Sequence, residues 1–510
     1  MLTHLDRPRP APTGDRRRAH AVVIGSGFGG LAAAVRLGAR GYRVTVLEKL
    51  DAPGGRAYVF RQDGFTFDAG PTIITAPWLL EELWALCGRK LHDDIELKSL
   101  SPFYDIRFDD GSVFTYSGDP EAMRAQIRKF SPADVPRFDR FMRHSKRIYD
   151  YGFGVLADVP FHSFGTMLKA VPKILLLGGH RTVYGLVSSY LRDPRLRIAI
   201  SLHPLLIGGN PFSVTAMYCL INHMEREWGV HFAMGGTGEL VKGLVGLIRN
   251  QGNSLRCNAE VRRILVEDGR AAGVELADGT RIAADVVVSN ADAAWTYNKL
   301  LPPRGRRRWT PGKVRRTHYS MGLFVWYFGT NRRFPEVPHH SMVLGPRYRG
   351  LLRDIFKRKT VAKDFSIYLH RPTATDPALA PPGCDTFYAL APVPHLEAGF
   401  DWEAGAEAYR QAVAERLEET VMPGLRESVV SSRVMTPKDF ESRYNSYLGA
   451  GFGPEPLLWQ SAWFRPHNSS EEVAGLYMVG ASTHPGAGIP GVIASARVLD
   501  KVVPHANELV

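Results

Sequence analysis

Cysteine is scarce in this chain. The 510 residues include four cysteines, none in a CxxC pair, at positions Cys87, Cys219, Cys257 and Cys384. Disulfide frameworks and thiolate metal sites both need cysteines at close, regular spacings. The spacing therefore argues against a disulfide-stabilised domain and against a thiolate metal site, and it predicts four buried cysteines without a chemical role.

Long apolar runs are missing as well. A membrane-spanning helix needs about 18 to 20 uncharged apolar residues, and runs such as "VPKILLLGG" (171–179) and "MGLFVWYFG" (321–329) are much shorter. The first residues are basic and rich in proline, and no apolar segment with a small-residue cleavage site follows them. We therefore expect a disordered cytoplasmic leader over residues 1–19, and any membrane contact to be peripheral.

Acidic residues are outnumbered by basic ones. The chain has 51 Asp and Glu against 64 Lys and Arg, a net charge of +13, which suits nucleic acid, anionic lipid or an anionic cofactor equally well. No helix-turn-helix, zinc-finger or ribonucleoprotein pattern is present, so no nucleic-acid partner is expected. The 45% hydrophobic content is that of a folded globular protein, and the length allows two or three domains.

The most informative segment is "VVIGSGFGGLAAAVRLGARGYRVTVLEK", residues 22–49. The run His20–Ile24 is typical of a buried parallel strand. Apolar residues then recur at helical spacing, at Leu31, Ala32, Val35 and Leu37. A second β-branched run after Gly41 completes a strand-helix-strand unit of about 30 residues.

The turn of this unit carries GxGxxG, formed by Gly25, Gly27 and Gly30. The first glycine allows the tight turn, the second lets the backbone approach a pyrophosphate, and the third lets helix and strand pack closely. Glu48 ends the second strand, where a carboxylate can accept a hydrogen bond from a ribose hydroxyl. A glycine turn that serves packing alone and a solvated glutamate are the alternatives; together the two features predict a dinucleotide site.

NAD and FAD share this first unit, and "DAPGGRA" (51–57) favours FAD. Gly54 and Gly55 permit a second close backbone approach, and Arg56 supplies a fork of donors suited to a diphosphate. With this segment the sequence resembles the two-dinucleotide-motif flavoproteins, which include amine oxidases and carotenoid desaturases. The segment "FTFDAGPTII" (65–74) is similar to the part of those proteins that passes beside the flavin ring.

The stretch "QSAWFRPHNSSEEVAGLYMVGASTHPGAGIPGVIASA" (460–496) is similar to the signature of bacterial-type phytoene desaturases. Its glycines, Gly480, Gly486, Gly488 and Gly491, allow a close approach before a helix, where the flavin could rest; a packing role is the alternative. Resemblance to the same family extends over residues 20–500, through segments at 206–212, 225–240, 288–292 and 390–396.

Other patterns predict the remaining organisation. Helical patterns broken by prolines predict a helical insert between about 75 and 229. Residues 260–290 predict three short strands joined at Asp268-Gly269 and Asp278-Gly279. Residues 476–499 again predict strand, glycine-rich turn and helix.

The resemblance implies an α/β fold with a Rossmann-like FAD-binding domain of the amine oxidase-like type, an interleaved substrate domain and a helical membrane-facing region. The FAD-binding domain is expected over 20–75, 230–295 and 470–510, and the substrate-binding and membrane-associated region over 76–229 and 296–469. The expected FAD-binding residues are Gly25, Ser26, Gly27, Phe28, Gly29, Gly30, Glu48, Lys49, Gly54, Gly55, Arg56, Gly70, Pro71, Thr72, Val261, Gly480, Gly488, Ile489 and Val492.

The implied activity is FAD-dependent desaturation of phytoene, an acyclic C40 chain, to neurosporene or lycopene, in which the flavin takes a hydride and the protein positions the chain. A quinone or oxygen is the expected electron acceptor, because the sequence shows no second dinucleotide site for a nicotinamide. Four alternatives stay open: a later-pathway desaturase of hydroxylated or methoxylated carotenoids, a C30 desaturase, a carotene isomerase, and a nicotinamide-dependent reductase. A flavin-bearing carotenoid-binding protein without turnover is the non-enzymatic alternative.

Two further expectations concern chemistry and membrane contact. His484 and Asp68 are acid-base candidates, but neither is assigned a catalytic role, and no metal-ligand spacing is found. In the segment Met167–Leu191, leucines, valines and tyrosines are expected to face lipid on the cytoplasmic side of the cell membrane, while Lys169, Lys173 and Arg181 meet phosphates. A solvated face over an ordinary core is the alternative.

Overall fold

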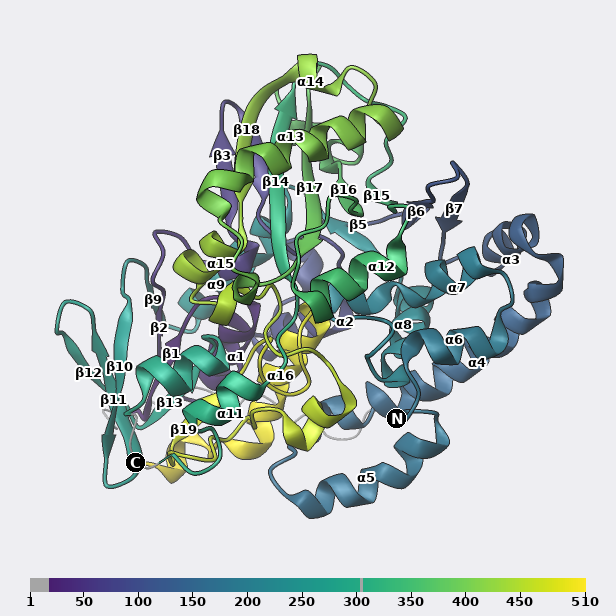
Figure 1. Cartoon of the computed structure of the whole chain (residues 1–510). Helices are drawn as coiled ribbons and strands as arrows, with labels where there is room; N and C mark the ends of the chain where they lie inside the picture. Colours follow the sequence, from purple (N-terminus) through teal and green to yellow (C-terminus); the bar gives the residue numbers. More distant parts are fainter. Residues whose placement is uncertain (1–17, 303–305) are drawn as a thin grey trace.

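The computed structural model describes residues 18–302 and 306–510 (Figure 1). Residues 1–17, most of the expected leader, lie outside this part. The guanidinium of Arg18 donates hydrogen bonds to the carbonyls of Gly41 and Tyr42, and Ala19 is buried. The expected leader boundary at residue 19 is therefore wrong, because both residues belong to the folded chain.

The first framework of the fold is a five-stranded sheet with the order β19-β13-β1-β2-β9. All neighbouring strands run parallel. The strands are β1 (His20–Ile24), β2 (Arg43–Leu47), β9 (Ser254–Arg256), β13 (Val286–Ser289) and β19 (Leu476–Met478). Three separate stretches of the chain thus build one sheet. The strands predicted near the two ends of the chain, β1, β2 and β19, all belong to it.

Alternate residues of these strands face two different layers. Ala21 and Val23 pack with helices on one face, whereas Val22 and Ile24 pack with a small sheet on the other. The helices are α1 (Phe28–Ala39), α2 (Trp78–Leu86), α9 (Thr237–Asn250) and α16 (Ile489–Val502). The small antiparallel sheet contains β10 (Val261–Glu267), β11 (Arg270–Leu276) and β12 (Arg281–Ala283).

Both expected hairpin turns of the small sheet are confirmed. Asp268, Gly269 and Gly279 have φ angles of 48°, 78° and 87°, in the left-handed region that such turns require. The expected third strand, however, is two strands. Its second half is β13, which leaves the hairpin and enters the parallel sheet, because Val286, Val287 and Val288 are buried on both faces instead of alternating.

A seven-stranded sheet forms the second framework, with the order β18-β14-β17-β16-β15-β6-β7. Neighbours are antiparallel except β15 and β6. The run "MGLFVWYFG" supplies its buried strand β14. The bounds are β6 (Tyr104–Arg107), β7 (Val113–Tyr116), β14 (Gly322–Thr330), β15 (His340–Val343), β16 (Ile367–His370), β17 (Asp385–Val393) and β18 (Val429–Met435).

The segment 75–229 is not purely helical, contrary to the expectation. Tyr104, Ile106, Phe114 and Tyr116 are buried at alternate positions, and this period of two produces β6 and β7 inside the segment. The helices of the segment after α2 gather on one side of the molecule (Figure 1). They are α3 (Pro120–Phe130), α4 (Val135–Gly152), α5 (Phe164–Leu176), α6 (Val183–Tyr190), α7 (Pro194–Ser201) and α8 (Leu220–Trp228).

The remaining elements are short ladders and helices outside the two frameworks. Phe324 of β14 stacks on Trp402 of α13 (Trp402–Thr420), which covers the seven-stranded sheet. The short ladders are β3 (Val59–Gln62) with β4 (Phe65–Asp68) and β5 (Leu97–Ser99) with β8 (His231–Ala233). The other helices are α10 (Ala293–Trp295), α11 (Pro311–Arg316), α12 (Tyr348–Arg353), α13 (Trp402–Thr420), α14 (Leu425–Ser428) and α15 (Pro437–Tyr444).

Two expectations about surfaces are corrected here. Of the four cysteines, which are all free thiols, only Cys219 is buried, so the other three are not the expected core residues. Within Met167–Leu191, Val183 and Val187 are buried in the core and cannot face lipid; the exposed apolar side chains lie on α5. Among the helices of 18–302 and 306–510, none has both the length and the apolar character needed to span a bilayer.

Candidate functional site

One continuous cavity of about 550 Å³ is lined by residues of both frameworks and of α4, α5 and α8. One end is built from glycine-rich turns of the parallel sheet, and the other end is apolar. All the expected FAD-binding residues line the cavity except Gly30 and Gly480. The sequence motifs therefore meet at one place in the fold.

The GxGxxG turn opens the start of α1 toward the cavity. Gly27 is the N-cap of α1, and no side chain caps the free N–H groups of the first turn. Gly30 has a packing role instead, because a Cβ there would lie 2.0 Å from the carbonyl oxygen of Gly25. Gly29 is similarly confined, since a Cβ added there would lie 2.6 Å from Oδ1 of Asn290.

Glu48 follows β2 and is buried beside this turn. Its Oε2 accepts hydrogen bonds from the Ser26 N–H (2.9 Å) and Oγ (2.5 Å), and its Oε1 accepts one from the Leu50 N–H (2.9 Å). The carboxylate thus fixes the turn to the end of β2. Two carboxylate oxygens offer about four acceptor positions, so Glu48 retains capacity for a ribose hydroxyl.

A second glycine pair lies against the first turn. Gly54 and Gly55 have φ angles of 124° and 57°, and a Cβ on Gly55 would lie 3.2 Å from Cα of Gly27. Arg56 is half-buried, and its Nη2 donates to Ser446 Oγ (2.7 Å). Burial lowers the pKa of Arg56, while the nearby Asp292 raises it. The Arg56 Nε–H group has no hydrogen-bond partner within the described chain. A bound diphosphate would accept a hydrogen bond from it.

The second uncapped helix start belongs to α16. Its N-cap Gly488 has a φ of 92° and no side-chain cap, and Gly488, Ile489 and Val492 line the cavity. Gly480 packs instead against Asn290, whose Oδ1 would lie 2.5 Å from an added Cβ. Two free helix starts, tight glycine backbone and an unpaired guanidinium donor fit an anionic dinucleotide such as FAD.

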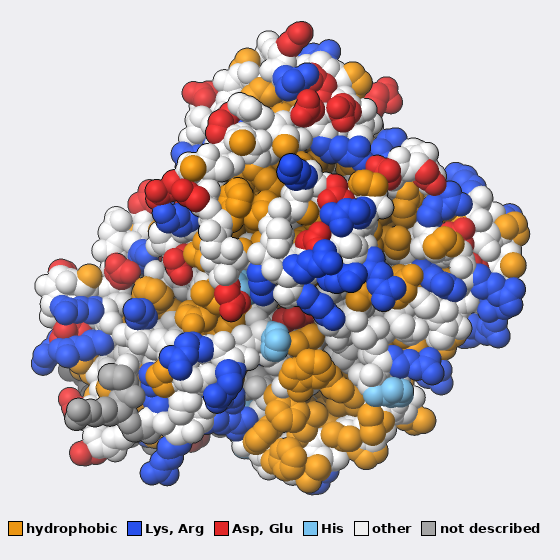
Figure 2. Space-filling view, in the orientation of Figure 1, with side chains coloured by type: hydrophobic (Ala, Val, Ile, Leu, Met, Phe, Trp, Pro, Cys, Tyr) orange, Lys and Arg blue, Asp and Glu red, His pale blue; other side chains and the backbone are white. Residues whose placement is uncertain are grey.

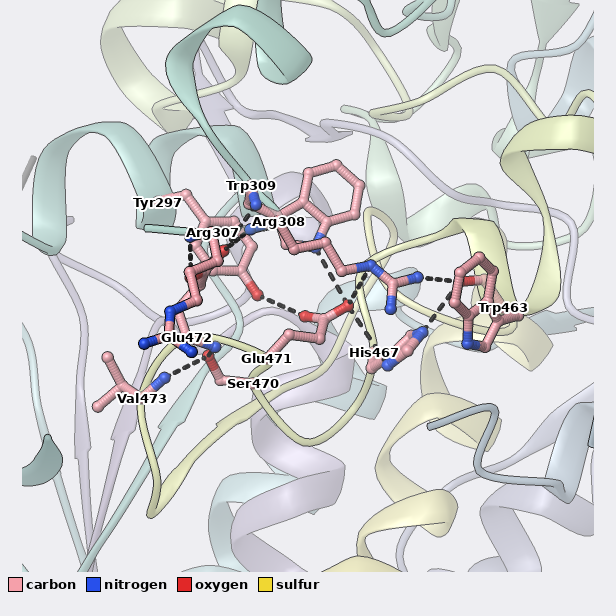
Figure 3. Close-up of polar contacts among 10 residues, drawn as sticks. All are labelled: Tyr297, Arg307, Arg308, Trp309, Trp463, His467, Ser470, Glu471, Glu472 and Val473. Carbon is pink, nitrogen blue, oxygen red and sulfur yellow. Dashed lines mark hydrogen bonds and ion pairs between the residues drawn. The ribbon is translucent and has the colours of Figure 1, made fainter. Parts of the chain in front are cut away.

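The middle of the 460–496 stretch is a scaffold (Figure 3). The carboxylate of Glu472 accepts hydrogen bonds from three consecutive backbone N–H groups, those of Arg307 (2.7 Å), Arg308 (2.8 Å) and Trp309 (2.6 Å). The Arg308 guanidinium lies 4.0 Å from the centre of the Trp463 ring. These contacts hold the loop that leads to the α16 turn, while residues 463–480 do not line the cavity.

The other end of the cavity is apolar. Its walls come from α4, α5, the segment 202–224 and strands of the seven-stranded sheet, and they suit a flexible hydrocarbon chain. Lining side chains there include Leu156, Met167, Ile174, Leu202, Leu205, Leu206, Met217, Leu220, Ile221, Met224, Met321, Leu323, Val325, Met342, Leu344 and Leu390.

Two tyrosines and a threonine interrupt this apolar surface. Thr72 Oγ1 lies 3.1 Å from the Tyr368 hydroxyl and 2.9 Å from the Tyr388 hydroxyl, and Tyr388 donates to the Gly70 carbonyl (3.1 Å). Burial raises the pKa of both tyrosines, so both stay protonated. The expected residues Gly70 and Thr72 are therefore held by the seven-stranded sheet.

A histidine cluster lies behind the two tyrosines. His340 Nδ1 lies 2.8 Å from the Tyr368 hydroxyl, and ring nitrogens of His339, His340 and His370 lie within 4.8 Å of one another. Burial lowers the pKa of all three, that of His339 to about 3. The sequence spacing did not predict this cluster, because His340 and His370 meet by pairing of β15 and β16.

Glu225 is a second feature that the sequence did not indicate. This buried residue of α8 lines the cavity, and its Oε2 accepts a hydrogen bond from the Tyr104 hydroxyl (2.8 Å) and lies 3.1 Å from His203 Nε2. The sequence signal was its position as the first residue of the segment 225–240, which resembles the family without giving Glu225 a role.

The two acid-base candidates differ in position. His484 lines the cavity, its Nε2 donates to the Leu156 carbonyl (2.9 Å), and burial lowers its pKa to about 3. Asp68 does not line the cavity. Its carboxylate accepts the Thr237 N–H at 3.0 Å, and burial raises its pKa to about 6. Asp68 therefore anchors the start of α9 instead of contacting a ligand.

The sequence profile described as "Flavin containing amine oxidoreductase" matches residues 28–498. The chain belongs to this family. The expected cofactor FAD, the amine oxidase-like fold and the oxidoreductase class are thereby confirmed. A flavin-bearing protein without turnover loses its support.

Curated relatives within this family bear out the resemblance to bacterial-type phytoene desaturases. The phytoene desaturase (neurosporene-forming) of Cereibacter sphaeroides is 51% identical over 98% of this chain and 97% of its own length. The phytoene desaturase (lycopene-forming) of Pseudescherichia vulneris is 49% identical over 93% and 97%.

Solved structures of the same fold are more distant in sequence. An oxidoreductase from Methanosarcina mazei has a TM-score of 0.64 at 19% identity, covering 94% of this chain and 100% of its own. Wild-type putrescine oxidase bound to putrescine has a TM-score of 0.64 at 15% identity, covering 95% and 99%. These two establish the fold alone.

Proposed function

We propose that this protein is an FAD-dependent phytoene desaturase that introduces successive double bonds into the acyclic C40 chain, forming neurosporene or lycopene. The observation that carries the proposal is the single cavity that joins two uncapped helix starts to a long apolar passage. The names of relatives at 49–51% identity support the substrate.

The chain would hold the cofactor at the glycine end. Glu48 faces the ribose, while Arg56 and the start of α1 face the diphosphate. When bound, FAD supplies a hydride acceptor. The apolar walls formed by residues such as Leu206 and Ile221 orient the hydrocarbon and exclude water, and Thr72 with its two tyrosines fixes the polar edge of the cavity.

We further propose that the enzyme works on the cytoplasmic surface of the cell membrane and takes its substrate through α5. Phe164, Leu168, Leu175 and Leu176 of α5 are 47%, 57%, 46% and 84% exposed. They fall within the apolar patch that the space-filling view shows where α5 lies (Figure 2). Other side chains of the same helix, Met167 and Ile174, line the cavity.

One helix thus has an apolar face toward the outside and another toward the passage. Lys169 and Lys173 are exposed on the same helix and are suited to lipid phosphates. A substrate that is nearly insoluble in water could enter here without crossing solvent. A quinone or oxygen is the proposed electron acceptor, because the second GxGxxG turn of the sequence, at 486–491, lines the same cavity as the first and therefore belongs to the same cofactor site.

The test is conversion of phytoene in liposomes by the FAD-loaded protein, with a quinone present and both NAD and NADP left out. Coloured polyenes identified as neurosporene or lycopene are the expected products. Untouched phytoene beside a reacting hydroxylated or C30 carotenoid would replace the proposed substrate. Colour that forms only after a nicotinamide is added would replace the proposed acceptor.

A further inference from the structure

Four acidic residues of the described chain line the cavity, and one stands apart from the rest. Glu48, Glu260 and Asp292 belong to the glycine end, next to β2, β10 and β13. Glu225 lies on α8, where its lining neighbours include Ile221 and Met224. It is the carboxylate of the apolar half, where the hydrocarbon would lie.

Two side chains hold this carboxylate in one orientation. The Tyr104 hydroxyl donates to Glu225 Oε2 (2.8 Å), His203 Nε2 lies 3.1 Å from the same oxygen, and the Tyr104 hydroxyl and His203 Nε2 are 2.9 Å apart. Glu225 and His203 are 1% and 0% exposed. Both polar partners meet Oε2, so Oε1 is the oxygen left to face the cavity.

Other groups near the apolar half are poor proton acceptors. Tyr368 and Tyr388 are protonated, and the imidazoles of His339, His340 and His370 do not line the cavity. His484 donates its Nε2–H to a backbone carbonyl, and burial lowers the pKa of its imidazole to about 3. Among the described groups that line the apolar half, Glu225 is therefore the one positioned to accept a proton.

We propose, resting on the proposed function, that Glu225 is the base that accepts the proton lost by the substrate in each desaturation. The C–H bond at one carbon breaks, and its electron pair becomes the second bond of the new C=C. The proton bonds to Glu225 Oε1, which becomes a carboxylic acid. Bound FAD would supply the acceptor for the hydride of the neighbouring carbon, so the substrate would lose two hydrogens in all.

His203 and Tyr104 act through Glu225 and are positioning residues. Both hold Oε2 of the carboxylate, so the proton acceptor Oε1 keeps one orientation toward the cavity. The proton on Oε1 must leave before the next step of a repeated desaturation.

The experiment measures flavin reduction after anaerobic mixing of FAD-loaded protein with phytoene-containing liposomes. Glu225→Gln keeps the size of the side chain but removes its basicity, and we expect about 10²- to 10⁴-fold slower reduction. FAD content and liposome binding should be unchanged. The matched control is Tyr116→Phe, which removes the hydroxyl bonded to Asn222 of the same helix and leaves Glu225 untouched; its rate should stay near that of the wild type.

Chemical rescue separates catalysis from structure. Formate added to Glu225→Ala should restore part of the rate in proportion to the concentration of its anion, an effect that a purely structural residue would not give. Glu225→Asp, which keeps the carboxylate, should retain an intermediate rate even if the other variants fold poorly. A wild-type rate in Glu225→Gln, or a slow Glu225→Ala that formate leaves unchanged, would overturn the proposal.

If wild-type protein with FAD bound is not reduced by phytoene at all, the proposed function fails and not the assignment of the base. The same FAD-loaded protein would then be mixed with the alternative carotenoids. Glu225→Gln would again have to be the slow variant with whichever substrate reduces the flavin; a Glu225→Gln rate equal to the wild-type rate there would remove Glu225 as the base.

Discussion

The two ends of the cavity are built by different means. The glycine end is made of backbone from short motifs, where Gly27, Gly54 and Gly55 touch one another and an added Cβ would meet neighbouring atoms at about van der Waals distance or closer. The apolar end is made of side chains from segments far apart in the chain. A backbone-built site tolerates almost no change in shape, whereas a side-chain-built site can change in size. Substitutions at the cofactor end should therefore abolish FAD binding, whereas substitutions at the substrate end should change the rate and the product.

The largest expected effect is at Gly30. Gly30→Val would place a Cβ 2.0 Å from the Gly25 carbonyl, a contact that only movement of β1 or α1 can relieve. We expect loss of folded, FAD-bound protein, measured by flavin content and circular dichroism. The control is Gly246→Ala in α9, where nothing lies within 4 Å of the added Cβ; it should be neutral or slightly stabilising, by about 0.5–1 kcal/mol. A stable, FAD-bound Gly30→Val protein would contradict the expectation that the glycine end tolerates almost no change in shape.

Glu48→Arg should come next. It leaves the Ser26 and Leu50 N–H groups without their acceptor and puts a cation beside Arg56. Losing charge-assisted hydrogen bonds of about 1.5–3 kcal/mol corresponds to about a 10- to 100-fold weaker FAD affinity. Titration of the apoprotein with FAD measures it, with Glu267→Arg at an exposed strand end as control. Equal affinity in both variants would remove Glu48 from the ribose site.

The apolar end should respond more mildly and in a different observable. Leu206→Trp narrows the passage, and overpacking there costs about 1–3 kcal/mol, so we expect about tenfold slower phytoene turnover and products with fewer double bonds. FAD content should match the wild type, because the change leaves the backbone of the glycine turns unaltered. Chromatography of the carotenoids measures the shift. A variant that loses FAD together with turnover would show that the two ends are not independent.

The smallest effect is expected on the outer face of α5. Leu176→Asp replaces the 84% exposed side chain with a charge, and losing about 1 kcal/mol of apolar insertion weakens liposome binding about fivefold. Protein stability should not change, because the leucine is not packed in the core. Val430→Asp on β18, at the opposite end of the molecule from α5 (Figure 1), is the matched control. Equal liposome binding by both variants would remove α5 as the docking face.

The contrast between the two ends also explains what the sequence could predict. Gly25, Gly27, Glu48 and Arg56 were readable because each role depends on backbone geometry within one short unit. The strand-helix-strand unit, the hairpin turns at 268–269 and 278–279 and the last helix were readable for the same reason. FAD and the family followed from these motifs and from the resemblance over residues 20–500.

What the sequence missed depends on pairing between distant segments. Glu225 meets Tyr104 and His203 only because α8, β6 and the segment after α7 pack together. His340 and His370 meet through sheet register. The strands β6 and β7 were missed because they are short and lie among helices, and the buried face of α6 was missed because the apolar residues of a surface helix and of a core helix look alike in sequence.

The strand order of the parallel sheet has a consequence for how the protein is made. β2 ends at Leu47 and β19 begins at Leu476, and a ribosome adds about 5–20 residues per second. The glycine turn at the beginning of the chain therefore emerges tens of seconds before the α16 turn that completes the cavity. FAD can be enclosed only after the α16 turn has been made, so nascent chains that stop before residue 476 should carry no flavin.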